Sequence, residues 1–333
     1  MLDCAINFFR FHARVFLIYP FLLASSTYLE IDLREVKPAT LQSEAMRSDS
    51  PHGEPIFERE SKVLWVAGES NLWRWSLDTN AVTRIELPAG LKHPFNLLDI
   101  KPKNIWGFDR QAIWIFDISS KIWRKISYQL DADCLLNSAS VSQSSGEVAY
   151  FISSTCGGYW ISQATETVVG WRSKDKSTKD FFALVNGSDS SGPYFLLPNR
   201  KQILKLRLKE QKVTSEIVYH SKSELLGIKG EGDNFVAWTS KAIIIFDRAM
   251  NRRQVIPVVG RRNIAAFAAS ADLHGLIFDD GAAEIMDLKS NQKWFGKEPI
   301  KRVQNIDFID DAAYLVISSK AEIPRVFRVT IRR

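Results

Sequence analysis

The sequence predicts an all-β fold, a seven-bladed β-propeller with four-stranded antiparallel blades. Three observations lead to this prediction: a unit that repeats at a steady spacing, a last copy that lacks one strand, and an unpaired strand near the N-terminus. Each unit centres on an apolar strand followed by a polar turn, and the copies are anchored about 40–46 residues apart, at Leu77, Ile118, Ser162, Leu208, Arg248, Leu288 and Ile331. A period of about 40–45 residues with four strands per unit is typical of propellers.

The second copy shows how a unit is built. Its strands are expected at residues 95–100, 105–108, 113–118 and 122–128, and turn-forming residues separate them. In other copies, runs such as residues 242–246 are apolar at consecutive positions, which indicates a sheet that is covered on both faces. Blades that pack face to face meet that requirement. Several first strands, for example residues 265–269, are rich in small side chains, which suit the crowded innermost position.

The seventh copy is incomplete. It has expected strands at residues 303–309, 313–318 and 325–331 but no fourth strand. Near the N-terminus, residues 28–34 alternate between apolar and polar side chains and have no partner close in sequence. We therefore expect residues 28–34 to pair with residues 325–331 as the outer strand of the last blade. This pairing would close the ring and remove the exposed edges that an open sheet leaves.

The first 26 residues have the features of a signal peptide. Arg10 and Arg14 precede an apolar run at residues 15–24, which is about half of the ~20 residues that span a bilayer. Ala24 and Ser26 suit the −3 and −1 positions of a cleavage site, so cleavage is favoured over the alternative, an uncleaved anchor. Cleavage would leave the mature chain without a transmembrane span, in the periplasm or outside the cell. The remaining residues 27–333 are expected to form one propeller domain with a loose connector at residues 36–53.

The cysteine content excludes a disulfide-scaffold class, because the 333 residues contain only three Cys. Two of them, Cys134 and Cys156, begin the first strand and follow the second strand of the third unit. These strands are expected to be antiparallel neighbours, so folding the hairpin brings the two cysteines opposite each other. We expect a disulfide between them in an oxidising compartment. The alternative is two separate thiols.

The charged residues favour an anionic partner. The chain has 44 Lys and Arg against 38 Asp and Glu, a net charge of +6. In a propeller the blade-to-blade loops and the turns between second and third strands share one face. These loops contribute an expected binding face made of Lys92, His93, Lys174, Lys176, Lys179, Lys222, Arg261, Arg262, Lys301 and Arg302. Such a face attracts anions through its summed field. The alternative is solvated loop charge with no partner.

The sequence predicts no catalytic residue, no metal site and no cofactor. The five His have no pair at ligand spacing, which argues against zinc. Residues 279–281, Asp-Asp-Gly, resemble the start of a calcium loop but are better explained as a hairpin turn. No nucleic-acid motif accompanies the basic residues, so nucleic acid is not an expected partner.

One segment suggests a family. Residues 286–294 resemble the repeat of quinoprotein-type propellers, which usually reads Leu-Asp-x-x-Thr-Gly-x-x-x-Trp. Over residues 27–333 the units are similar to the seven-bladed propeller superfamily, WD40-like and quinoprotein-like, although the Gly-His and Trp-Asp signatures of WD40 repeats are missing. The resemblance implies an exported bacterial type, since bacterial envelopes contain such propellers as scaffolds for outer-membrane assembly.

Two functional hypotheses follow. The first is a non-enzymatic, monomeric binding scaffold of the bacterial cell envelope that holds an envelope protein or an anionic glycan on the basic face. The second is a hydrolase or lyase that acts on an extracellular substrate at the central channel. The polar residues expected on the innermost strands form no evident acid/base pair, which favours the scaffold; they are Asp99, Asn137, Asn186, Lys229 and Asp307.

Overall fold

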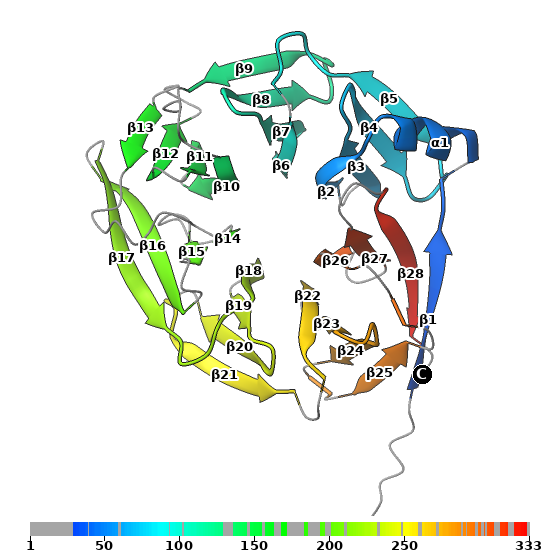
Figure 1. The fold of residues 1–333 in the computed structure, drawn as a ribbon, viewed down its shortest axis with the longest axis vertical. Helices are drawn as coiled ribbons and strands as arrows, with labels where there is room; N and C mark the ends of the chain where they lie inside the picture. The colour runs from blue at the N-terminus through cyan, green and yellow to red at the C-terminus, as the bar shows by residue number, and fades with distance from the viewer. Residues whose placement is uncertain are drawn as a thin grey trace, which may run out of the picture.

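The structure is a computed structural model of the 333-residue chain. It describes residues 29–38, 40–58, 61–92, 94–101, 103–128, 136–144, 147–154, 157–162, 168–171, 183–185, 194–196, 201–209, 212–231, 234–247, 249–258, 262–270, 273–287, 289–290, 292–296, 299–300, 303, 305–309, 314–318 and 323–331. Within these residues the fold is an all-β propeller of antiparallel sheets arranged in a ring (Figure 1).

Five sheets have four strands each, and each sheet uses four strands that follow one another in the chain. The first has β2 (His52–Glu58), β3 (Val63–Ala67), β4 (Asn71–Ser76) and β5 (Val82–Glu86). The second has β6 (Asn96–Lys101), β7 (Asn104–Phe108), β8 (Ala112–Asp117) and β9 (Trp123–Ser127). The third has β10 (Leu136–Ser144), β11 (Glu147–Ser154), β12 (Gly157–Ser162) and β13 (Val168–Trp171).

The next two sheets continue the pattern. One has β14 (Ala183–Val185), β15 (Tyr194–Leu196), β16 (Gln202–Lys209) and β17 (Lys212–His220). The other has β18 (Gly227–Glu231), β19 (Asn234–Trp238), β20 (Ala242–Asp247) and β21 (Arg252–Pro257). In each sheet the first strand lies nearest the centre of the ring and the fourth lies at the periphery (Figure 1).

The last sheet has eight strands, because the N-terminal strand β1 (Leu29–Val36) joins two four-stranded halves. One half has β22 (Ile264–Ser270), β23 (Leu273–Phe278), β24 (Ala283–Asp287) and β25 (Lys293–Gly296). The other has β26 (Asn305–Ile309), β27 (Tyr314–Ser318), β28 (Arg325–Ile331) and β1.

Strand β1 is paired along both edges. Its antiparallel pairing with β28 runs from Ile31↔Ile331 to Val36↔Val326, so residues 31–34 of the segment predicted at 28–34 pair with the C-terminal strand. Its first residues also pair in parallel with β25, with Leu29 opposite Trp294. The sequence analysis did not anticipate this second pairing. The result is that β1 is an interior strand of the sheet.

Among the described residues, apolar clusters lie between several neighbouring sheets, for example between the first and second sheets and between the fourth and fifth. Consecutive apolar runs such as residues 243–246 of β20 are buried, as expected for a sheet covered on both faces. Where β1 and β28 meet the first sheet, one cluster combines Val316 and Val326 with Trp73 and Trp75. Burial of these large side chains is the main source of stability in such an interface.

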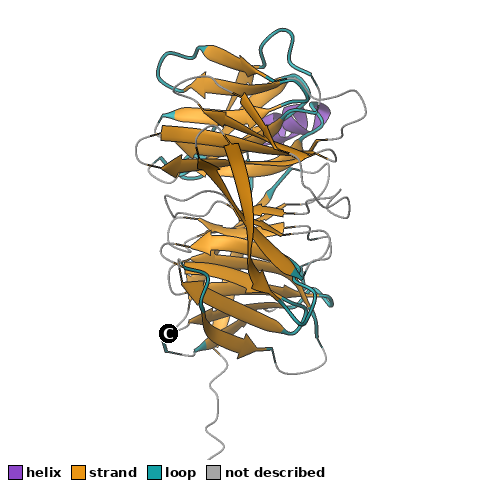
Figure 2. Cartoon of the chain, turned by 90° about the vertical axis from the view of Figure 1, so that its left-hand side faces the viewer, coloured by secondary structure: helices purple, strands orange, loops and turns teal. Residues whose placement is uncertain are grey.

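The connector expected at residues 36–53 is not loose. It contains helix α1 (Thr40–Ser48), which lies toward one face of the disc in the edge-on view (Figure 2). Met46 is fully buried in the cluster between β28 and the first sheet. The helix ends at Ser48. Two residues later, Ser50 has a φ of 47°, and its N–H donates to the Arg47 carbonyl at 3.1 Å, which closes the last turn. Among the helix residues whose burial is described, Met46 is the apolar residue placed in a core, and a single such position gives no periodic pattern that would predict the helix.

Candidate binding face

One face of the ring collects two kinds of connection. The register places Phe108, at the end of β7, opposite both Asn96 and Ile113, at the starts of β6 and β8. The end of β9 lies beside the start of β8, since Ser127 pairs with Ala112. The sheet-to-sheet loops and the turns between second and third strands therefore share this face, which we call the junction face.

A buried carboxylate joins a loop and a turn at the second sheet. Asp109, in the turn between β7 and β8, is 1 % exposed. Its Oδ1 accepts hydrogen bonds from the backbone N–H groups of Gln111 and Ala112 at 2.7 and 2.8 Å. Its Oδ2 accepts from Lys92 N in the incoming loop at 2.8 Å and from Trp114 Nε1 at 2.7 Å. This arrangement fixes the loop that carries Lys92 against the turn that carries Arg110.

Tyr128 extends the same network. Its hydroxyl donates to the backbone carbonyl of Asp109. Burial raises the pKa of the Tyr128 phenol, and the nearby negative charge of Asp109 raises it further. The phenol is therefore a neutral donor at every physiological pH, which suits a structural contact.

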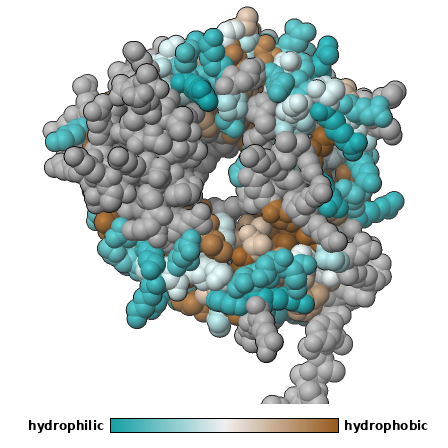
Figure 3. All heavy atoms as spheres, viewed as in Figure 1, coloured by the Kyte–Doolittle hydropathy of each residue, from teal (hydrophilic) through white to brown (hydrophobic). Residues whose placement is uncertain are grey.

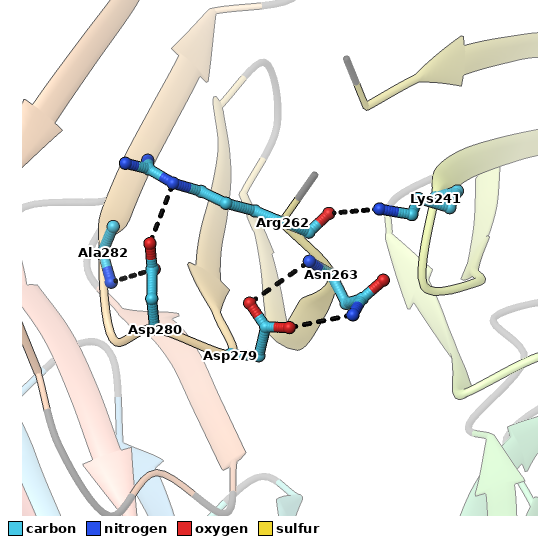
Figure 4. Close-up of polar contacts among 6 residues, drawn as sticks. All are labelled: Lys241, Arg262, Asn263, Asp279, Asp280 and Ala282. Carbon is cyan, nitrogen blue, oxygen red and sulfur yellow. Dashed lines mark hydrogen bonds and ion pairs between the residues drawn. The ribbon is translucent and has the colours of Figure 1, made fainter. Parts of the chain in front are cut away.

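A second loop-to-turn link lies where the β18–β21 sheet meets β22 (Figure 4). Asp279 accepts from the backbone N–H and the side-chain Nδ2 of Asn263 at 3.3 and 2.8 Å. These hydrogen bonds, the side-chain one first, hold the pKa of Asp279 below its ordinary value. Beside it, Arg262 Nε lies 2.9 Å from Asp280 Oδ2, and Lys241 Nζ donates to the Arg262 carbonyl at 2.8 Å.

These contacts make the side chains of Arg262 and Lys241 less available to an external partner. Arg262 was expected to offer a free positive charge, but its guanidinium is paired with Asp280 and lies 5.7 Å from the centre of the Phe278 ring. Lys241 is committed to a backbone carbonyl. Among the described residues of this corner, the positive charges of Lys241 and Arg262 are matched by the negative charges of Asp279 and Asp280. Here the polar groups mainly fix the loop.

The other expected binding residues divide into two groups. Lys92 and Lys222 lie in sheet-to-sheet loops of the junction face and are exposed. The remainder, together with the two cysteines proposed as a disulfide, lie outside the residues that the structure describes; they are His93, Lys174, Lys176, Lys179, Arg261, Lys301, Arg302, Cys134 and Cys156.

The structure adds cations that the sequence analysis passed over. Arg110, Lys201 and Lys241 are exposed in turns between second and third strands. The rule that places these turns on the junction face was sufficient to find them, but the sequence analysis applied it only to the loops. Exposed carboxylates share the face with the cations, namely Glu69, Glu224, Asp279 and Asp280. The described part of the face is thus mixed in charge.

Three cations stand out within that mixture. For the side chains of Lys92, Arg110 and Lys222, the described residues supply no ion pair within 4.0 Å. Lys92 and Arg110 lie on either side of the buried Asp109. These are the positive groups of the described junction face that remain available to a partner.

A pocket of ≈ 760 Å³ opens where α1 approaches the end of β1 and the start of β28. Trp75 lines it together with Val36, Pro38, Pro51, Ile323 and Pro324. Charged residues on its walls are partly paired, since Glu35 contacts both Arg325 at 3.1 Å and Lys37 at 3.5 Å. Helix α1 supplies one wall through Ser43, Glu44 and Arg47.

The centre of the ring is open in the space-filling view (Figure 3). Asp99, Asn137, Lys229 and Asp307 fall on the innermost strands β6, β10, β18 and β26, and Asn186 lies outside the described residues. Over the described part of the chain, no group of three His, Cys, Asp or Glu could hold a metal ion. No helix among the same residues has the length and hydropathy needed to cross a membrane.

Comparison with known proteins supports the fold alone. No family model matches the chain, and no curated protein matches it. The Cps50 (Swd1) β-propeller domain of Myceliophteria thermophila is 10% identical with a TM-score of 0.61, over 84% of this chain and 96% of that chain. The WD40 repeats of RRP9 are 11% identical with a TM-score of 0.60, over 90% of this chain and 98% of that one. The chain is therefore similar in fold to WD40 β-propellers.

Proposed function

We propose that the protein is a non-enzymatic scaffold that binds an acidic protein partner on its junction face. The observation that carries this proposal is the group of three exposed cations, Lys92, Arg110 and Lys222, that have no ion-pair partner among the described residues. Exposed unpaired cations on one face attract acidic surfaces, and the attraction weakens as salt rises. The similarity in fold to WD40 domains supports a role in protein interaction.

The proposal includes a complete ring. We infer that the eight-stranded sheet is two blades joined by β1, so that seven blades surround the central opening. The double pairing of β1 and the apolar cluster between β28 and the first sheet support this inference. A closed ring has no free sheet edge at its seam, and it offers a rigid platform for the junction face.

The compartment is also part of the proposal. We propose export to a bacterial envelope, directed by residues 1–26, with the mature chain acting as a monomer. No specific observation favours the hydrolase or lyase alternative. An anionic glycan in place of a protein partner is an outcome that the binding test can distinguish.

The experiment compares two triple charge reversals in the mature protein. The variant Lys92→Glu/Arg110→Glu/Lys222→Glu changes the junction face. The control Lys103→Glu/Lys121→Glu/Lys212→Glu makes the same change in net charge among exposed lysines on the opposite face. Binding to immobilised polyglutamate and to immobilised heparin is measured between low and physiological salt.

We expect the junction-face variant to lose about tenfold or more in affinity for polyglutamate at low salt and to lose most of its salt dependence. The control should bind like the parent. Equal loss in both variants would mean a general effect of net charge and would overturn the proposal. If the parent protein bound heparin and did not bind polyglutamate, the partner would be an anionic glycan and not an acidic protein. Photo-crosslinking in cells from positions 92 and 222 would then identify the natural partner.

A further inference from the structure

The buried carboxylate that serves the first sheet comes from an unexpected part of the chain. Asp49, directly after helix α1, is only 9 % exposed. Its Oδ2 accepts a 2.7 Å hydrogen bond from Trp73 Nε1, and its Oδ1 accepts a 2.8 Å hydrogen bond from Ser70 N. Its backbone carbonyl accepts from Glu69 N at 2.8 Å. Three donors of the first sheet therefore converge on one residue of the N-terminal segment.

In the second sheet, the same role belongs to a residue of the turn itself. Asp109 lies five residues before Trp114 and accepts its indole N–H. The residue five positions before Trp73 is Gly68. The two positions are structurally equivalent, because Gly68 N donates to Asn71 O at 2.8 Å just as Asp109 N donates to Ala112 O at 3.0 Å.

Gly68 leaves the space that Asp49 occupies. A Cβ atom added to Gly68 would lie 2.1 Å from Asp49 Oδ2 and 2.6 Å from Asp49 Cγ. Side-chain atoms cannot approach so closely, so an aspartate at position 68 and the observed placement of Asp49 exclude each other. The missing side chain at Gly68 therefore makes room for the carboxylate of Asp49.

We propose that residues 40–51 form a strap that is held in place by the Asp49 carboxylate, which occupies the space left by Gly68. The strap connects the end of β1 to the first sheet, and its second attachment is Met46, which is fully buried between β28 and that sheet. The strap thereby couples the N-terminal strand to the sheet that follows it around the ring. Because α1 forms one wall of the ≈ 760 Å³ pocket, release of the strap also removes that wall.

The first test releases the strap. Asp49→Ala should increase hydrogen exchange across residues 40–51 and the rate of tryptic cleavage after the exposed Arg47 by about tenfold, because the buried hydrogen bonds of the Asp49 carboxylate are lost. Glu44→Ala, an exposed change in the same helix, is the matched control and should leave both rates unchanged. Unchanged exchange and cleavage in Asp49→Ala would overturn the proposal.

The second test moves the carboxylate. In Asp49→Ala/Gly68→Asp, the aspartate at position 68 can accept from Trp73 Nε1 as Asp109 accepts from Trp114. We expect the double variant to melt well above Asp49→Ala, while tryptic cleavage after Arg47 stays as fast as in the single variant. Gly68→Asp alone should melt lower than the parent because Asp49 fills the same space. A double variant that melts no higher than Asp49→Ala would show that this space is not shared and would contradict the proposal.

Discussion

Trp114 Nε1 and Asp109 Oδ2 are joined by a 2.7 Å hydrogen bond in a carboxylate site that also receives three backbone N–H groups. Removing the carboxylate leaves these donors without their acceptor at a site where Asp109, Ala112 and Trp114 are buried. We therefore expect Asp109→Ala to reduce the free energy of unfolding by about 3–5 kcal/mol. Urea denaturation followed by tryptophan fluorescence measures this change.

The control for that experiment is an exposed aspartate. Asp78 is paired with Lys62 at 3.7 Å on the surface, and Asp78→Ala should cost less than about 1 kcal/mol. Asp109→Asn should fall between the two, because an amide oxygen can still accept at one position. If Asp109→Ala cost no more than Asp78→Ala, the carboxylate would not be the structural centre of this turn.

Aspartates in the turns between third and fourth strands should make the stability of the fold fall in acid. Asp117, Asp247 and Asp287 each accept backbone N–H groups at Oδ1. These hydrogen bonds lower the pKa of each carboxyl group, chiefly through the backbone N–H of residues 120, 251 and 290 respectively. A carboxyl whose pKa is lower in the folded state stabilises the fold above its unfolded pKa of about 3.9. That contribution is lost as pH falls through the folded-state pKa.

We therefore expect a melting temperature that is nearly constant above about pH 5 and falls below about pH 4. The triple variant Asp117→Asn/Asp247→Asn/Asp287→Asn should melt lower at neutral pH and fall less steeply in acid, because the amide retains an acceptor but does not titrate. Asp78→Asn serves as the comparison. An identical acid slope in the parent and the triple variant would assign the acid sensitivity to other groups.

The pairing of β1 with β28 predicts a cross-link. Asp32 and Thr330 are directly opposed in the register. In a background without the native cysteines, Asp32→Cys/Thr330→Cys should form a disulfide and raise the melting temperature relative to its reduced form. The off-register pair Asp32→Cys/Arg328→Cys should cross-link poorly. Efficient cross-linking of both pairs, or of neither, would argue against a fixed register for β1.

The repeated part of this fold could be predicted from the sequence, because propeller sheets alternate apolar strands with polar turns at a steady period. Strands such as β8 and β20 lie within one residue of their expected positions. The pairing of residues 28–34 with the C-terminal strand followed from counting strands. The strand positions follow from local sequence patterns, and the pairing follows from one strand that lacks a partner nearby in the sequence.

The features that could not be predicted depend on contacts between distant residues. Helix α1 is stabilised by Met46, which packs in a core formed by residues of β28 and the first sheet. This single contact leaves no periodic apolar pattern in the sequence that would predict the helix. Asp49 occupies the space that a side chain at position 68 would need, and it accepts the indole N–H of Trp73. Neither Asp49 nor Gly68 has a sequence pattern that predicts this arrangement, which becomes evident only when Gly68 is aligned with Asp109. For Arg262 the sequence gives a charge but not its partner, Asp280.

The disulfide expected between Cys134 and Cys156 joins two positions outside the described residues, so it stays a prediction from the sequence. The described register of this hairpin stops where Leu136 pairs with Ser154, and Ser154 also pairs with Gly157 of β12. Opposed Cα atoms in an antiparallel pair are about 4.5–5.5 Å apart, within the range that a disulfide accepts. An exported protein would meet the oxidising conditions that the bond requires.

The bond and its alternative, two separate thiols, differ in how mutations combine. Closing a loop of about 22 residues should contribute on the order of 3 kcal/mol in the chain-entropy model. With a bond, Cys134→Ser, Cys156→Ser and the double variant should all lose similar stability, because either single change breaks the same link. Separate thiols would instead give additive losses. Mass spectrometry of the unreduced, alkylated protein from the exported fraction provides the direct measurement: the bond predicts that neither cysteine is alkylated, and alkylation of both would exclude it.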